Sequence, residues 1–179
     1  MNQPSSTSAP KRALLVIDLQ HDYFPGGQYP LWNADAVLER VVEAIERAQA
    51  LDVPVLLVQH VGTAASPFFQ PDSAGVAIHS RIHAAAPQAP VVVKGHADSF
   101  HQTRLAELLA PLEVEQLLLC GMMTQNCVTH TALSKAADAY AVSVLTDACT
   151  TVDELLHKIA LNALGTRVAL RSSADALAD

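Results

Sequence analysis

Short apolar runs alternate along the chain with longer stretches of amphipathic spacing. Residues 13–19 (ALLVIDL) are rich in Leu, Val and Ile and reach an acid near their end. In residues 34–51, Val37, Val41 and Ile45 fall on one helical stripe, and the charged residues lie mostly off it. The runs predicted as strands are residues 13–19, 53–60, 91–94, 116–121, 141–145 and 167–170. The stretches predicted as helices are residues 34–51, 102–109, 126–139 and 152–164.

This alternation predicts the fold class. Continuously apolar strands are typical of a parallel sheet that helices cover on both faces. With right-handed crossovers they predict an α/β fold, a doubly wound six-stranded parallel sheet in three layers. A single domain is expected over residues 13–179, after a disordered leader at residues 1–12 that lacks the apolar stretch of a signal peptide. Residues 61–90 form the longest irregular stretch, and a loop of that length is usually functional.

Composition narrows the class of function. The chain has 179 residues, of which 50% are hydrophobic and 16% charged, so it can bury a core without disulfides or a structural metal. The formal net charge of -7 argues against binding to nucleic acid or to an anionic membrane surface. No apolar run approaches the roughly 18 residues of a membrane span. Three cysteines without CxxC spacing fit a reducing compartment, so we expect a cytoplasmic protein with free thiols.

Reactive side chains stand at the ends of the predicted strands. An open parallel sheet binds ligands beyond the carboxyl ends of its strands. There the chain carries Asp18, His60, Lys94 and, at the start of a predicted helix, Cys127. A helix N-terminus and a nearby ammonium both favour a thiolate, and an aspartate can take a thiol proton. Acid, ammonium and thiol suffice for acyl transfer through a thioester, but only the strand order decides which of them meet.

Each of these residues also has a structural interpretation. Cys127 alone is most often a small buried apolar side chain, and Asp18 with Lys94 could form a structural ion pair. Cys120, inside LLLCG, is expected in the core. The motifs of several other enzyme classes are absent from the sequence, since it has no GxGxxG after the first strand, no GxxxxGK[ST], no HExxH and no GxSxG.

Several segments match, in order, the motifs of one enzyme family. The chain reads ALLVIDLQHDYF where that family has an apolar strand and D-x-Q-x-D-[FY]-F, and VVVKGHADSFHQT where it has a strand, a lysine and S/A-F-x-x-T. GMMTQNCVTHT matches G-x-x-T-x-x-C-V-x-x-T, DACTT matches D-[AG]-x-x-T, and DSAGVAIH matches an element before the lysine. Over residues 12–170 the chain resembles the isochorismatase-like cysteine hydrolases, which include nicotinamidases, ureidoacrylate and maleamate amidohydrolases and streptothricin hydrolase-like enzymes. The resemblance implies their Rossmann-like fold.

The resemblance further implies a catalytic triad of Asp18, Lys94 and Cys127. Cys127 would attack a carbonyl carbon, Asp18 would act as base toward the thiol and then as acid toward the departing amine, and Lys94 would hold the charge balance. It also implies a cis peptide bond between Met122 and Met123. The backbone N–H groups of Met123 and Cys127 would then form the oxyanion hole.

Aromatic and polar residues on the strand-end loops are the candidate substrate-binding residues. They are Gln20, Phe24, Trp32, His60, Phe68, Phe100 and Gln125. Nicotinamidases place D-x-H at the end of the second strand for a metal ion, whereas this chain has QHVG at residues 59–62, without an acid. We therefore expect neither a catalytic metal nor a cofactor.

The leading hypothesis is a metal-independent cysteine hydrolase that cleaves a C–N amide bond of a small molecule through a thioester. Two alternatives of the same fold are an isochorismatase-type vinyl-ether hydrolase and a non-catalytic small-molecule-binding scaffold. A metallohydrolase that uses His60, His79 or Asp98 is another alternative. The resemblance also implies a homo-oligomer, either a dimer or a tetramer.

Overall fold

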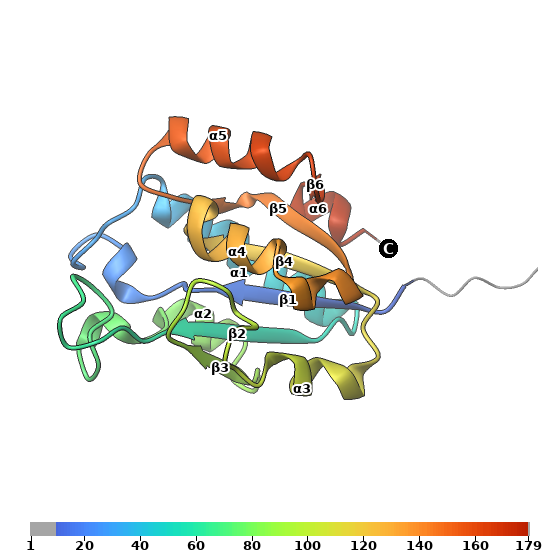
Figure 1. The fold of residues 1–179 in the computed structure, drawn as a ribbon, viewed down its shortest axis with the longest axis horizontal. Helices are drawn as coiled ribbons and strands as arrows, with labels where there is room; N and C mark the ends of the chain where they lie inside the picture. The colour runs from blue at the N-terminus through green and yellow to red at the C-terminus, as the bar shows by residue number, and fades with distance from the viewer. Residues whose placement is uncertain (1–9, 179) are drawn as a thin grey trace, which may run out of the picture.

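Six parallel strands pair in the order β3-β2-β1-β4-β5-β6 in the computed structural model, which describes residues 10–178. The strands are β1 (Arg12–Ile17), β2 (Val55–His60), β3 (Val91–Lys94), β4 (Gln116–Met122), β5 (Ala141–Thr150) and β6 (Ala169–Arg171). The first strand lies in the middle, and the chain adds strands to one side of it and then to the other (Figure 1). The doubly wound α/β fold predicted from the sequence is confirmed.

Helices flank the sheet on both faces (Figure 1). They are α1 (Ala34–Ala50), α2 (Ser80–Ala85), α3 (Leu105–Leu109), α4 (Thr129–Ala132), α5 (Glu154–Leu164) and α6 (Ser173–Ala176). On one face α1 contacts α2 and α6, and in the view of Figure 1 the helix α4 lies in front of the sheet and α1 behind it. The apolar stripe predicted for α1 is the buried side of that helix, including Val37, Val41 and Ile45. Among the described residues, none of these helices is long and apolar enough to cross a bilayer.

The prediction of one continuous helix over residues 126–139 is wrong. The segment is divided into the single turn η4 (Thr124–Val128), then α4, then η5 (Lys135–Ala139). The division follows from local hydrogen bonds, because Ser134 has extended ψ and its hydroxyl caps the next turn by accepting from the N–H of Ala136. Hydroxyl side chains compete with helical backbone in this way.

Other boundaries also differ from the predicted ones. The helix expected from residue 102 begins at Leu105, because Gln102 has a left-handed φ of 55°. Residues 61–90 are not wholly irregular, since they include the turn η2 (Ala74–Val76) and the helix α2, whose Ile82 is buried. The leader predicted at residues 1–12 lies mostly outside the described residues, and β1 already begins at Arg12.

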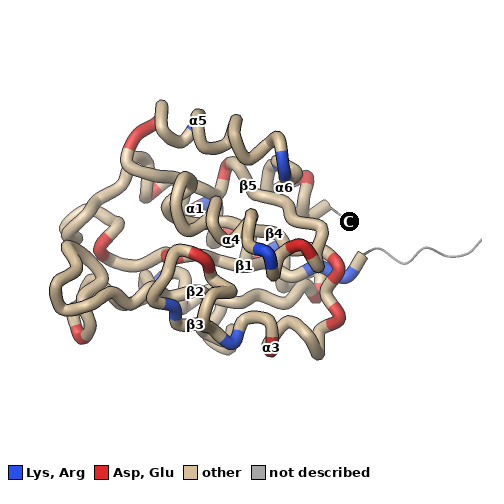
Figure 2. Tube along the Cα trace, in the orientation of Figure 1, with Lys and Arg blue, Asp and Glu red and all other residues tan. Residues whose placement is uncertain are grey.

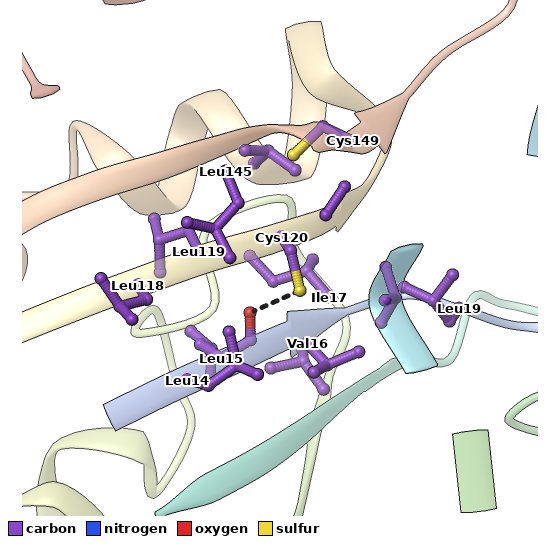
Figure 3. Close-up of a cluster of buried hydrophobic side chains, with 14 of the residues drawn as sticks. Leu14, Leu15, Val16, Ile17, Leu19, Leu118, Leu119, Cys120, Leu145 and Cys149 are labelled. Carbon is purple, nitrogen blue, oxygen red and sulfur yellow. Dashed lines mark hydrogen bonds between the residues drawn. The ribbon is translucent and has the colours of Figure 1, made fainter. Parts of the chain in front are cut away.

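The hydrophobic core contains many aliphatic side chains from the two central strands, β1 and β4. Figure 3 shows Leu14, Leu15 and Val16 of β1 beside Leu118 and Leu119 of β4. Cys120 belongs to this core, as the sequence suggested, and its thiol donates to the carbonyl of Leu15 at 3.7 Å (Figure 3). Because this core is closely packed, the two central strands are rigid. Asp18 and Cys127 follow their carboxyl ends.

Candidate active site

The strand order brings Asp18, Lys94 and Cys127 to one point. Asp18 directly follows β1, Lys94 ends β3, and Cys127 lies in η4, the turn after β4. The strands β1 and β4 are neighbours, and the winding of the chain changes direction between them. Ligands of open α/β sheets bind at such switch points, beyond the carboxyl ends of the strands. Because β2 separates β3 from β1, the long side chain of Lys94 reaches across it.

The ammonium of Lys94 lies at the centre of the cluster. Its Nζ is 2.9 Å from Asp18 Oδ2 and 3.2 Å from Cys127 Sγ. It also lies 3.1 Å from His60 Nδ1 and donates to the carbonyl of His96 at 3.2 Å. Asp18, Lys94 and Cys127 are buried, with 0%, 2% and 2% of their surface exposed. The thiol and the carboxylate are therefore both hydrogen-bonded to one ammonium, away from bulk water.

The backbone at the strand ends has unusual geometry. Asp18 has a φ of 55°, in the left-handed region that aspartate tolerates better than most residues. Gly121 has a φ of 122°, and a Cβ there would lie 2.0 Å from the carbonyl oxygen of Ile17, so only glycine fits between β1 and β4. The peptide bond between Met122 and Met123 is cis, at the place that the resemblance gave.

Burial sets the protonation of the cluster. Burial raises the pKa of the Cys127 thiol, the Asp18 charge raises it further, and Lys94 only partly opposes them. Lys94 by itself favours the thiolate, as expected from the sequence, but burial and the Asp18 charge outweigh it, so the resting group is the thiol. Burial by itself lowers the pKa of Lys94, but Asp18 and Cys127 outweigh it, so the net direction is upward and the ammonium stays charged. Burial and the neighbouring ammonium lower the pKa of His60, which is neutral.

One carboxylate oxygen of Asp18 is free to accept a proton. Oδ2 accepts from Lys94, whereas Oδ1 is buried and has no hydrogen-bond partner among the described residues. A buried carboxylate oxygen without a partner is costly, and a proton from the neighbouring thiol or from a bound molecule would satisfy it. The cluster thus contains a protonated nucleophile, an acceptor for its proton and a fixed positive charge.

The same donors could in principle hold a metal ion. One ligand atom each from Asp18, His60 and Cys127 lie within 4.8 Å of one another. Lys94 Nζ is hydrogen-bonded to all three of these side chains, so an ammonium occupies the centre of the donor set. A cation that is part of the chain thus supplies the positive charge that a metal would bring. The arrangement is an ion-pair cluster rather than an open coordination shell.

Comparison with known proteins places this chain in a family. The isochorismatase domain model matches residues 12–175. The chain belongs to the isochorismatase family. It is 36% identical over 141 residues to an uncharacterized isochorismatase family protein of Bacillus subtilis (78% of this chain and 77% of that protein), and 29% identical over 178 residues to the nicotinamidase of Escherichia coli (78% and 83%). A crystal structure from Oleispira antarctica, described as an isochorismatase hydrolase, aligns with a TM-score of 0.85 at 31% identity, over 97% of this chain and 99% of that one.

These matches make the isochorismatase-family chain a hydrolase, and they confirm the resemblance inferred from its motifs. Of the predicted substrate-binding residues, His60 contacts Lys94, with Nδ1 at 3.1 Å from the Lys94 Nζ. Gln20 is fully buried and its carboxamide is taken up by backbone: it donates to the carbonyls of His60 and Val76 and accepts from the N–H of His60. Gln20 therefore joins β1 to the end of β2 and to η2.

Two other predicted substrate-binding residues, Phe24 and Phe68, line a cleft between two loops. Phe24 packs on His79 and Phe68 on Tyr23, and both phenylalanines line a cleft of about 1000 Å³ between residues 21–28 and 67–79. The three triad residues do not line that cleft.

Three further predicted residues contact α5, the residue before β5 and the residue after β5. Trp32 is 36% exposed beside His157, and Phe100 stacks on Tyr140. The side-chain oxygen Oε1 of Gln125 accepts from the Thr151 hydroxyl at 2.5 Å.

Sequence reasoning missed a buried carboxylate that holds two of these loops. Asp22 accepts from the N–H of Gln28 at 3.1 Å and from the N–H of Phe69 at 2.6 Å. A Cβ at Gly75 would lie 1.9 Å from Asp22 Oδ1, so η2 also packs directly on this carboxylate. The signal was available, because Asp22 is the second acid of the D-x-Q-x-D motif, but an acid before two aromatic residues does not reveal its acceptors.

Proposed function

We propose that this family member is a metal-independent cysteine hydrolase that cleaves a C–N amide bond of a small molecule through a thioester. The observation that carries the proposal is the position of Lys94 Nζ, 2.9 Å from Asp18 Oδ2 and 3.2 Å from Cys127 Sγ. The proposal is supported by the similarity to a nicotinamidase. It is also supported by the thiol itself, because vinyl-ether hydrolysis needs no sulfur nucleophile.

In the first half-reaction, the carbonyl carbon of the substrate accepts the sulfur of Cys127. The thiol proton passes to Asp18 as the C–S bond forms, which matches a resting thiol and an unpartnered Asp18 Oδ1. The negative charge on the substrate oxygen is stabilised by the backbone N–H groups of Met123 and Cys127, which we assign as the oxyanion hole. The C–N bond then breaks, and the amine leaves with the proton that Asp18 held.

In the second half-reaction, a water molecule takes the place of the amine. Asp18 accepts a proton from this water, the hydroxide attacks the thioester, and the C–S bond breaks to give the carboxylic acid. The sulfur takes back a proton, which restores the thiol. Lys94 remains an ammonium throughout, and it compensates the charge that passes between Asp18 and Cys127.

The test is ammonia or amine release over a panel of small amides, with mass spectrometry of the intact protein. We expect a thioester adduct on Cys127, and a loss of turnover of at least about 1,000-fold in Cys127→Ala and in Asp18→Asn. Cys149→Ala is the matched control, because that thiol is also buried but lies outside the cluster, and it should retain turnover. Full amide turnover in Cys127→Ala would exclude a thioester.

Two further measurements separate the alternatives. Dialysis against a chelator should leave amide turnover unchanged, and a loss of turnover that zinc restores would support a metallohydrolase. Vinyl-ether cleavage that persists in Cys127→Ala but disappears in Asp18→Asn would support the isochorismatase-type reaction.

A further inference from the structure

The positive charge of the cluster is the Lys94 ammonium, and its hydrogen-bond donors are already in use. A lysine ammonium has three N–H donors, and Lys94 Nζ contacts four groups: Asp18 Oδ2, His60 Nδ1, Cys127 Sγ and the His96 carbonyl. Among the hydrogen bonds and ion pairs of residues 10–178, no other lysine or arginine reaches the Asp18 or Cys127 side chain. A substrate carboxylate beside Cys127 would therefore find no free cation.

The loops that follow the strands carry a net negative charge. These loops comprise residues 19–33, 61–79, 95–104, 123–128 and 151–153. They contain four aspartates, which are Asp22, Asp72, Asp98 and Asp153. Arg104 is their only lysine or arginine. In Figure 2 the outermost loops at the left, beyond the strand ends, show acidic positions and no basic ones.

Two cations on helices that directly follow these loops are paired with acids. Arg81, at the start of α2, makes a two-pronged ion pair with Glu39. Lys158, in α5, pairs with Glu154 at 2.7 Å. Neither is free to offset the aspartates of the loops, so the approach to the site is electronegative.

We propose that the site takes uncharged or cationic amides and rejects amides that carry a carboxylate close to the scissile bond. Burying a carboxylate without a partner cation is costly. The negative loops also lower the local concentration of an approaching anion. The inference rests on the proposed amide hydrolysis for its substrate class, but the exclusion of anions is a property of the site that can be measured without turnover.

Iodoacetamide and iodoacetate test that exclusion directly, because they are similar in size and differ in charge. The rate of Cys127 alkylation by each is measured by peptide mass spectrometry, which separates it from Cys120 and Cys149, and is normalised to N-acetylcysteinamide. At about 10 mM ionic strength, where the Debye length is about 30 Å, we expect a normalised preference for iodoacetamide of at least about tenfold. The preference should shrink in about 0.5 M salt. A normalised ratio near one, or a preference for iodoacetate, would overturn the proposal.

Two conservative double variants locate the source of the effect. Asp72→Asn with Asp153→Asn removes two charges from the loops, and asparagine suits both the left-handed φ of Asp72 and the N-cap role of Asp153. Asp52→Asn with Asp138→Asn is the control, because these residues precede β2 and β5 at the opposite edge of the sheet. The first variant should reduce the preference for iodoacetamide and the control should not. Equal effects would show that only net charge matters and would contradict a role for the loops.

A series of matched benzamides connects the inference to turnover. The 4-aminomethyl, 4-hydroxymethyl and 4-carboxy derivatives share one scissile amide and differ in charge. We expect kcat/KM for the carboxylate to be at least about tenfold below that of the neutral compound. If the carboxylate is the best substrate, the inference fails while amide hydrolysis stands. If iodoacetamide is preferred but no amide of any charge is cleaved, the proposed function fails while the exclusion of anions stands.

Discussion

The imidazole Nδ1 of His157 lies 2.9 Å from the hydroxyl of Thr124, which joins α5 to the turn that carries Cys127. The Thr124 hydroxyl donates to the carbonyl of Thr150 at 3.0 Å, so it must accept from His157, whose proton is therefore on Nδ1. This buried hydroxyl connects β5, α5 and η4 at the carboxyl end of the sheet.

Removing that hydroxyl should damage both stability and turnover. Thr124→Val keeps the shape but leaves the Thr150 carbonyl and His157 without their partner, at a cost of about 1–3 kcal/mol in the free energy of unfolding. Because η4 then loses its anchor, we expect kcat to fall at least about tenfold. Urea unfolding and amide turnover measure the two effects. Thr124→Ser keeps the hydroxyl and should stay near wild type, and similar losses in both variants would contradict this account.

The buried ion pair gives a second prediction. Lys94→Met leaves the Asp18 charge buried without its partner, which should cost about 3–5 kcal/mol in the free energy of unfolding. Adding Asp18→Asn removes the unpaired buried charge, so the double variant should be more stable than Lys94→Met alone. Urea unfolding of the two single variants and the double variant forms a complete cycle. Additive costs would mean that the pair contributes nothing as a pair, although all three variants should lack turnover.

The thiols make stability depend on alkaline pH. Burial raises the pKa of Cys120 and Cys127, and raises that of Cys149 to about 12. In an unfolded chain thiols titrate near pH 8.5, as cysteine does in model peptides. Above that pH the unfolded chain has lost protons that the folded chain keeps, so the free energy of unfolding falls as pH rises.

The expected slope is about 1.4 kcal/mol per pH unit for each such thiol. Urea unfolding at several values from about pH 8 to about pH 10 measures it. Cys149→Ala should reduce the slope by one thiol's share, and the unaltered chain should show no comparable fall below about pH 8. A free energy of unfolding that stays constant over the alkaline range would contradict the burial of the thiols.

The contact between Gly121 and Ile17 predicts a sharp difference between two glycines. Gly121→Ala combines a positive φ with a Cβ placed 2.0 Å from a backbone oxygen, and we expect a loss of at least about 3 kcal/mol in the free energy of unfolding. Gly95→Ala is the matched control, because its Cβ would meet nothing closer than 3.9 Å. Equal urea midpoints for the two variants would show that β1 and β4 can separate more easily than the structure indicates.

The sequence predicted the sheet well because its strands are apolar throughout and its helices are spaced between them. The places of Asp18 and Cys127 beyond strand ends could also be expected, because each follows a predicted apolar run. What periodicity could not supply was strand order, and therefore it could not supply the reach of Lys94 across β2. The grouping of Lys94 with Asp18 and Cys127 came from the motif resemblance.

Local chemistry explains what the sequence pattern did not predict. The broken helix after Cys127 depends on hydroxyl caps such as Ser134, which a pattern of apolar residues does not register. The protonation of Cys127 depends on how deeply it is buried and on the nearness of the Asp18 charge, and a motif specifies neither. The role of Asp22 depends on backbone N–H groups that come from two separate loops.

The ammonium at the centre of the cluster stands on an edge strand of the sheet, β3, which has four residues and pairs only with β2. Short edge strands open more readily than the middle of a sheet. Fraying of β3 would separate Lys94 from Asp18 and Cys127 while β1 and β4 stay paired. Catalytic competence should therefore vanish at a milder denaturant concentration than the fold itself, and amides of β3 should exchange with deuterium before those of β1.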